Sequence, residues 1–218
     1  TVLDNPSRLE HYVTGGGRRA LTMDAVDTVR GDVEVYGLVR TQAKGSLFQL
    51  HLHGSGEAGN ESSYYLDINK PAGNVRINRY SGGSYQQLNA SPFEAEEHTW
   101  YHAVLKREGN TLKGKVWPYG EEEPDEWQVA VNDTSFGSGK VGVGNQGEGK
   151  INEWAFFGVG TGDESAPRAP EDLIVPNADQ IKYFVERFDE EGAFSNEESV
   201  RHLRTHLIAI SQYEVQEE

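Results

Sequence analysis

The sequence predicts a mainly β protein in which two antiparallel sheets pack as a sandwich. Glycine punctuates residues 1–158 at short intervals, and the runs between these glycines alternate apolar and polar residues with little helical periodicity. The 218-residue chain contains 25 glycines, 10 tyrosines and 4 tryptophans, a composition that favours a sandwich or barrel over a helical bundle. Its length fits one large β domain, alone or with an appendage.

The clearest predicted element is a β-hairpin formed by residues 99–107 and 111–117, which a turn containing Gly109 and Asn110 connects. Alternation assigns small or apolar residues to its inner face: Tyr101, Ala103, Leu105, Leu112, Gly114 and Val116. The opposite face carries His102, Lys106, Lys113, Lys115 and Trp117. We therefore expect a hairpin with one buried and one solvent-facing side.

Further strands are predicted before and after this hairpin. The earlier ones cover residues 20–23, 33–39, 46–53, 63–68 and 74–80, and the later ones cover 127–131, 140–144 and 151–157. These strands define a sandwich domain over residues 1–158.

The composition changes after Gly158. Residues 159–177 contain Pro167, Pro170 and Pro176 and little periodicity, which is typical of a linker. Residues 178–218 predict two amphipathic helices, with apolar stripes formed by Ile181, Phe184, Val185 and Phe188 and by Val200, Leu203, Leu207 and Ile210. Two such helices bury little apolar surface alone and must pack on something else.

Charge and composition exclude several partners. The net charge of −15 argues against nucleic acid or an anionic membrane as the main partner, because both need a positive surface. It weakly favours an uncharged ligand, although solubility alone also explains an acidic surface. The absence of cysteine excludes disulfides and Cys-based zinc sites. No apolar run approaches the roughly 20 residues that span a bilayer, so no membrane insertion is expected. The chain opens at Thr1, which suggests a mature or excised segment.

Alternation also groups polar and aromatic residues on the outer faces of several strands. The set comprises Gln49, His51, His53, Tyr65, Asp67, Arg76, Asn78, Tyr80 and Trp117. If these faces belong to one sheet, they combine aromatic planes with groups that pair with hydroxyls, which is the mixture that sugar binding needs. The alternative is that they are the solvated sides of ordinary strands.

Catalytic patterns are incomplete. Retaining glucanases need two carboxylates about 5–5.5 Å apart, and in the nearest match, residues 123–128, Gln128 takes the place of the second acid. Gln49 and His51 form a Gln-x-His strand similar to that of alginate-lyase-like sandwiches, without the companion strands of those enzymes. A hydrolase or lyase therefore remains an alternative.

The hairpin residues 100–104 and 115–118, together with residues 123–129, 142–144 and 151–156, carry a resemblance to known proteins. They resemble the concanavalin A-like jelly-roll superfamily, and most closely its laminin-G-like and levanase-type carbohydrate-binding modules. The resemblance covers roughly residues 10–158. It implies a jelly-roll fold and a polysaccharide or oligosaccharide as the ligand.

The same resemblance implies one structural calcium ion, because sandwiches of this superfamily often hold Ca²⁺ between their first and last strands. The oxygen ligands that the sequence offers are Asp24, Asp27, Asp32, Asn152 and Glu153. They have no regular spacing.

Residues 181–194 and 205–207 resemble the first half of the FIMAH module, a small helical unit at the ends of extracellular enzymes of Gram-positive bacteria. This resemblance implies an extracellular location, secreted or cell-wall-associated, in a bacterial parent protein that degrades polysaccharide.

These observations together predict a non-catalytic carbohydrate-binding module, monomeric, that anchors a secreted glycanase or lyase to its glycan. Two alternatives stay open: a jelly-roll glycoside hydrolase or polysaccharide lyase, and a structural or adhesion domain that binds no sugar.

Overall fold

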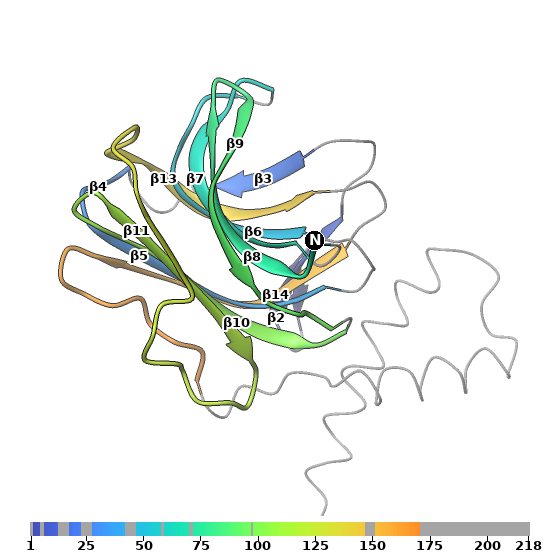
Figure 1. Ribbon diagram of the computed structural model, residues 1–218. Helices are drawn as coiled ribbons and strands as arrows, with labels where there is room; N and C mark the ends of the chain where they lie inside the picture. The colour runs from blue at the N-terminus through green and yellow to red at the C-terminus, as the bar shows by residue number, and fades with distance from the viewer. Residues whose placement is uncertain are drawn as a thin grey trace, which may run out of the picture.

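The computed structural model describes residues 2–4, 7–12, 18–22, 28–41, 47–57, 59–69, 72–96, 98–146 and 151–170 (Figure 1). These residues form two antiparallel sheets that pack face to face, which confirms the predicted mainly β sandwich. The predicted helices of residues 178–218 lie outside the described residues. No helix among the described residues is both long and apolar enough to cross a membrane.

Sheet 1 is built around the predicted hairpin. Its strands, in spatial order, are β1 (Val2–Asp4), β2 (Ser7–Tyr12), β14 (Ile151–Thr161), β5 (Val33–Thr41), β10 (Trp100–Glu108), β11 (Thr111–Pro118) and β12 (Val129–Asn132). In the hairpin β10–β11, Leu105 lies opposite Gly114, and Gly109 takes the positive φ of 59° that the tight turn requires.

Sheet 2 contains the strands that were predicted to carry most of the ligand-binding residues. Its order is β3 (Arg18–Thr22), β13 (Ser138–Gln146), β6 (Leu47–Ser55), β7 (Ser62–Asn69), β8 (Asn74–Ser81) and β9 (Ser84–Pro92), and β4 (Val29–Arg30) also pairs with β13. The sequence interpretation did not name β1, β2, β4 or β9 as strands.

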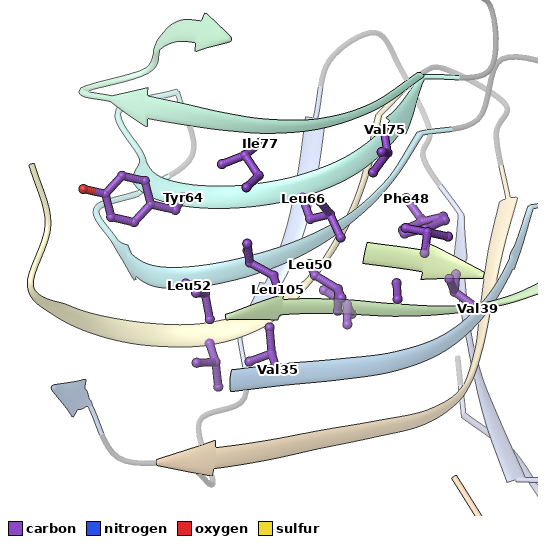
Figure 2. Close-up of a cluster of buried hydrophobic side chains, with 14 of the residues drawn as sticks. Val35, Val39, Phe48, Leu50, Leu52, Tyr64, Leu66, Val75, Ile77 and Leu105 are labelled. Atoms are coloured by element: carbon purple, nitrogen blue, oxygen red, sulfur yellow. The ribbon is translucent and has the colours of Figure 1, made fainter. Parts of the chain in front are cut away.

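The core lies between the two sheets, and each sheet contributes the alternate residues that face inward. Figure 2 shows Val35, Val39 and Leu105 of sheet 1 facing the aliphatic side chains of sheet 2. The inward residues of sheet 2 include Leu50, Leu52, Leu66, Val75 and Ile77, all fully buried or nearly so. In the hairpin, Leu105, Leu112 and Val116 are also fully buried, which confirms the inner face that alternation predicted for it.

The sandwich extends beyond Gly158, where the linker was expected to begin. Strand β14 continues to Thr161, and residues 162–170 then pack over the outer face of sheet 1, where Ala166 is buried. The backbone passes so close that a Cβ on Gly158 would lie 2.3 Å from the Pro167 carbonyl oxygen. Residues 159–170 are therefore part of the sandwich, and we call 162–170 the strap.

The absence of a side chain at Gly114 lets the two sheets approach. A Cβ at this position would lie 2.5 Å from Cδ1 of Leu66 and 3.1 Å from Cγ1 of Val129. We expect Gly114→Ala to lower the free energy of unfolding by about 1–3 kcal/mol through overpacking. Urea denaturation measures the change.

Gly137→Ala is the matched control, because the nearest atom to a Cβ there is Nη1 of Arg107 at an ordinary contact distance of 3.7 Å. A Gly114→Ala protein as stable as the control would contradict the close packing of the sheets at this point.

Candidate functional site

Strands β6, β7 and β8 bring seven of the nine predicted ligand-binding residues together on the outer face of sheet 2. The antiparallel register places His51 opposite Tyr65, and Asp67 opposite both Gln49 and Arg76. With Ser63 of β7 and Tyr85 of β9 these residues form what we call the polar-aromatic cluster: Gln49, His51, Ser63, Tyr65, Asp67, Arg76, Asn78, Tyr80 and Tyr85.

Four rings cross the cluster from β6 to β9. The His51 and Tyr65 rings stack with centroids 5.3 Å apart, and the Tyr65 and Tyr80 rings stack at 4.9 Å with an interplanar angle of 9°. Tyr85 follows at 5.9 Å from Tyr80 in a tilted arrangement. Such contacts add to the energy of burial and hold each ring in a fixed orientation.

An ion pair lies beside the rings. Arg76 donates from Nε and Nη2 to the two oxygens of Asp67, at 2.8 and 2.6 Å. Asp67 is fully buried, and the Arg76 side chain is 12% exposed. Burial raises the pKa of the Asp67 carboxyl, and the guanidinium of Arg76 works against this rise. The bidentate contact fixes the plane of the guanidinium and neutralises the only carboxylate of the cluster.

Hydrogen bonds fix the His51 ring at the other end of the cluster. His51 Nε2 lies 3.3 Å from Gln49 Oε1, which can only accept, so this nitrogen carries the proton. The Ser63 hydroxyl then donates to His51 Nδ1 at 3.0 Å. Gln49 Nε2 donates in turn to Gln146 Oε1 of β13 at 3.4 Å. His51 is thereby held in one tautomer and one orientation.

Most of the cluster is buried, although the sequence suggested a solvent-facing surface. Gln49, Tyr65, Asp67 and Asn78 have no exposed surface, whereas Tyr85 is 50% exposed. The Tyr65 hydroxyl and the Asn78 amide nitrogen make no hydrogen bond of good geometry, although Tyr80 lies beside the first and Asp67 beside the second. Burial raises the pKa of Tyr65 far above its ordinary value, so its hydroxyl stays a donor. Unsatisfied buried donors are rare and mark a site that can take up a further acceptor.

Tyr85 is the cluster residue that sequence reasoning missed. It follows the Gly82–Gly83 turn, opposite Tyr80 of β8, and its hydroxyl donates to Asn78 Oδ1 at 3.2 Å. The alternation of residues 84–90 after two glycines was the signal that could have revealed this strand.

His53 does not join the cluster, because a bulge interrupts the pairing of β6 with β7 between Leu52 and Ser55. His53 takes a positive φ of 50°, and its Nδ1 lies 3.3 Å from Nη1 of Arg107 in sheet 1. Burial, and then the charge of Arg107, lower its pKa to about 4. The side chain therefore lies between the sheets, and its predicted place on the outer face is wrong.

Trp117 lies on the outer face of sheet 1 and not with the other predicted residues. Its ring stacks on His102 at 4.8 Å, and it is 5% exposed because the strap and the loop of residues 119–128 cover this face. Lys115, next to it, donates to the Pro124 carbonyl at 2.6 Å and lies over the Trp127 ring. The outer side of the hairpin is thus largely covered, where a solvent-facing side was expected.

The strap is fixed to sheet 1 by Arg168. This side chain pairs with Glu34 of β5 and Glu123 of the loop, each at 2.8 Å, and its guanidinium lies over the Tyr36 ring. Burial acts to raise the pKa of the Glu123 carboxyl, but the charges of Arg168 and Lys115 lower it to about 2. Beneath the strap the Tyr36 hydroxyl lies 2.6 Å from His102 Nδ1, and burial lowers the pKa of His102 to about 4.

The predicted calcium ligands do not form one site. Asp32 precedes β5 and accepts a hydrogen bond from the Gly109 N–H at 2.7 Å. Glu153 pairs with Arg40 at the other end of β5, at 2.6 Å, and Asn152 adjoins it. Eight residues of strand separate these ends by about 25 Å. No group of three or more potential metal ligands occurs among the described residues, and Asp24 and Asp27 lie outside them.

Comparison with known proteins identifies the fold but assigns the chain to no family. The chain matches no protein-family model and no curated protein sequence. Among solved structures, the carbohydrate-binding module CBM66 from Bacillus subtilis aligns with a TM-score of 0.54 at 12% identity, over 64% of this chain and 80% of that one. A Bacillus subtilis protein of unknown function with a galectin-like fold aligns with a TM-score of 0.54 at 11% identity, over 75% and 84%. These likenesses show a galectin-like, jelly-roll β-sandwich.

The ion pair of the cluster yields a stability prediction. Arg76→Ala leaves the buried Asp67 carboxylate without its partner, and we expect the free energy of unfolding to fall by about 3–5 kcal/mol. Asp67→Asn combined with Arg76→Ala removes that charge and should restore part of the loss. Denaturant titration of the single and double variants measures both, and equal stability of the two would contradict the pairing.

The half-buried His102 predicts a pH dependence. Between pH 6.5 and 4 the unfolded chain binds a proton that the folded His102 does not, so the free energy of unfolding falls as the pH decreases. With a discount for its partial exposure, we expect His102 to contribute about 2 kcal/mol of this fall. Urea denaturation at pH 7 and 4.5 should show a smaller difference for His102→Gln than for the parent. His98→Asn, at an exposed histidine, is the control and should keep the parental difference.

Proposed function

We propose that the protein is a carbohydrate-binding module and that the polar-aromatic cluster is its binding site. The observation that carries this proposal is the row of four rings from β6 to β9 beside the Asp67–Arg76 fork. A sugar offers apolar C–H faces and a rim of hydroxyls, so it needs an aromatic surface next to fixed donors and acceptors.

Within the cluster, the exposed Tyr85 ring is the surface on which a sugar ring can stack. Arg76 uses Nε and Nη2 on Asp67, which leaves Nη1 available to a hydroxyl oxygen. The Tyr65 hydroxyl and the Asn78 amide are further donors once a ligand or a side-chain movement reaches them. The ion pair is neutral as a unit, which suits an uncharged sugar.

Three further observations support binding without catalysis. Glycoside hydrolysis uses two carboxyl groups, and Asp67, the one carboxylate of the cluster, is occupied by Arg76. A tyrosine that serves as a base needs a lowered pKa, whereas the pKa of Tyr65 is raised. The residues of the incomplete glucanase pattern lie in the loop that covers the outer face of sheet 1, where Gln128 pairs with the Val116 backbone and Glu123 with Arg168.

The fold is compatible with this proposal, since one structure similar to it is named a carbohydrate-binding module. The proposed role is to hold a secreted or wall-associated bacterial polysaccharide-degrading enzyme on its substrate, as the FIMAH-like residues 181–194 and 205–207 suggest. Such attachment raises the local concentration of the enzyme at the glycan. A site with few exposed contact groups implies an affinity in roughly the high micromolar to millimolar range.

Affinity electrophoresis against a panel of neutral polysaccharides tests the proposal. We expect retardation by at least one glycan, and Tyr85→Ala should weaken this binding about tenfold or more, which is about 1.4 kcal/mol. Lys113→Ala, on the outer face of sheet 1, is the control and should bind as the parent does.

Other outcomes would identify the alternatives. Release of product from the glycan by the isolated chain would show an enzyme. Absence of retardation by any glycan, together with tight binding to a wall protein, would show an adhesion domain and refute the sugar site.

A further inference from the structure

Among the strands that the structure describes, β9 is an open edge of sheet 2. It pairs with β8 on one side, and most residues of Ser84–Pro92 are exposed. Tyr85 on this strand is the one large hydrophobic side chain that is exposed among the described residues. Figure 1 shows β9 at the border of the sheet, with β8 behind it. An open edge presents backbone N–H and C=O groups that can pair with another strand.

The β8–β9 turn determines which of these groups point outward. Gly82 and Gly83 have φ angles of 53° and 77°, as in a two-residue type I′ hairpin, and the residues that flank them, Ser81 and Ser84, are a hydrogen-bonded pair. Hydrogen-bonded and non-bonded pairs alternate along antiparallel strands. Tyr85 and Gln87 therefore direct their backbone N–H and C=O groups away from β8, and Gln86 directs its own toward β8.

The outward groups lie only in the first half of the strand. Farther along, the Asn89 side chain donates to the Ala130 carbonyl of β12 at 2.8 Å and accepts from the Ala90 N–H at 2.9 Å. These contacts close the edge after the bulge that follows Gln87. The free segment is therefore Ser84–Gln87. Its two outward residues, Tyr85 and Gln87, lie one on each side of Gln86.

The strand also lacks the charged residues that often protect the edge of a sheet. Residues 84–92 contain no Asp, Glu, Lys or Arg in a chain of net charge −15. The edge strand β3 of the same sheet, in contrast, begins with Arg18 and Arg19, and β1 of sheet 1 ends with Asp4. Charged residues on an edge prevent pairing with other strands. Strand β9 is thus a neutral edge at which two acidic chains can approach.

We propose that β9 pairs with β9 of a second copy of this chain, antiparallel, about a two-fold axis at Gln86. In this arrangement Tyr85 exchanges two backbone hydrogen bonds with Gln87 of the other copy, and Gln87 does the same with Tyr85. A second copy suits the edge because its two outward residues are related by that axis, so one segment supplies both halves of the contact. Sheet 2 of one copy and sheet 2 of the other then form one continuous sheet, with both polar-aromatic clusters on the same face.

The contact is small. Four backbone hydrogen bonds and the side chains around them bury less than the roughly 1,200 Å² of a stable interface, so association is weak and concentration-dependent. Repulsion between two acidic chains weakens it further at low ionic strength. The proposal is independent of sugar binding. If the clusters do bind a polymer, two copies on one strand of glycan gain avidity.

Sedimentation equilibrium of the full chain, from 10 µM to 1 mM, tests the pairing. We expect reversible dimerisation that strengthens from about 50 to 300 mM NaCl as the repulsion is screened. Gln87→Pro removes one outward N–H without removing a hydrogen bond to β8, and it should abolish dimerisation. Gln87→Ala keeps the N–H and is the matched control, which should dimerise as the parent does.

A second variant covers the case in which the proline is not tolerated. Gln86→Lys places two like charges opposite each other on the axis and should also abolish dimerisation. A chain that stays monomeric at 1 mM overturns the proposal, as does dimerisation that persists in Gln86→Lys or in folded Gln87→Pro. A monomeric chain whose Tyr85 and Gln87 amide signals shift on addition of an extended peptide would show an edge for another protein instead.

Discussion

The structure depends on how closely two large side chains pack against two glycines. Trp154 lies against Gly37, where a Cβ would be 2.6 Å from its ring, and Leu66 lies against Gly114, where a Cβ would be 2.5 Å away. The Leu66–Gly114 contact joins the two sheets, whereas Trp154 and Gly37 lie on neighbouring strands of sheet 1. Because both contacts are close, the sheets can take only a narrow range of separations. This packing requires the side chains on the inner face of each central strand to be apolar and small enough to fit between the sheets. Apolar and polar residues therefore alternate along these strands.

The two outer faces of the sandwich are completed in different ways. On sheet 1 the chain covers its own aromatic residues with residues 119–128 and the strap, which Lys115 and Arg168 fix. On sheet 2 polar and aromatic side chains pack on one another, and the Tyr85 ring at their end remains half-exposed. An exposed aromatic ring beside fixed polar groups leaves a face able to interact with a ligand. The second face is therefore the one on which a ligand is to be sought.

Sequence periodicity predicted much of this arrangement and failed for identifiable reasons. Regular pairing from β6 to β8 makes alternation a reliable guide, so Gln49, His51, Tyr65, Asp67 and Arg76 were grouped correctly on one face. An alternating pattern cannot reveal a bulge, so the inward position of His53 was not predicted. The pattern also assigns a residue to a face of its strand without identifying the sheet, so Trp117 of sheet 1 was grouped with residues of sheet 2. Burial of the outer faces also depends on segments distant in sequence, such as the strap on β5, which no local pattern encodes.

Because Arg168 attaches the strap to the face opposite the polar-aromatic cluster, the last described residues lie on the far side of the sandwich from that cluster. A pulling force applied through residue 170 would first act on the ion pairs with Glu34 and Glu123 and would reach the hydrogen bonds of β14 only after these had broken. The sheet that carries the cluster would be the last part to be loaded.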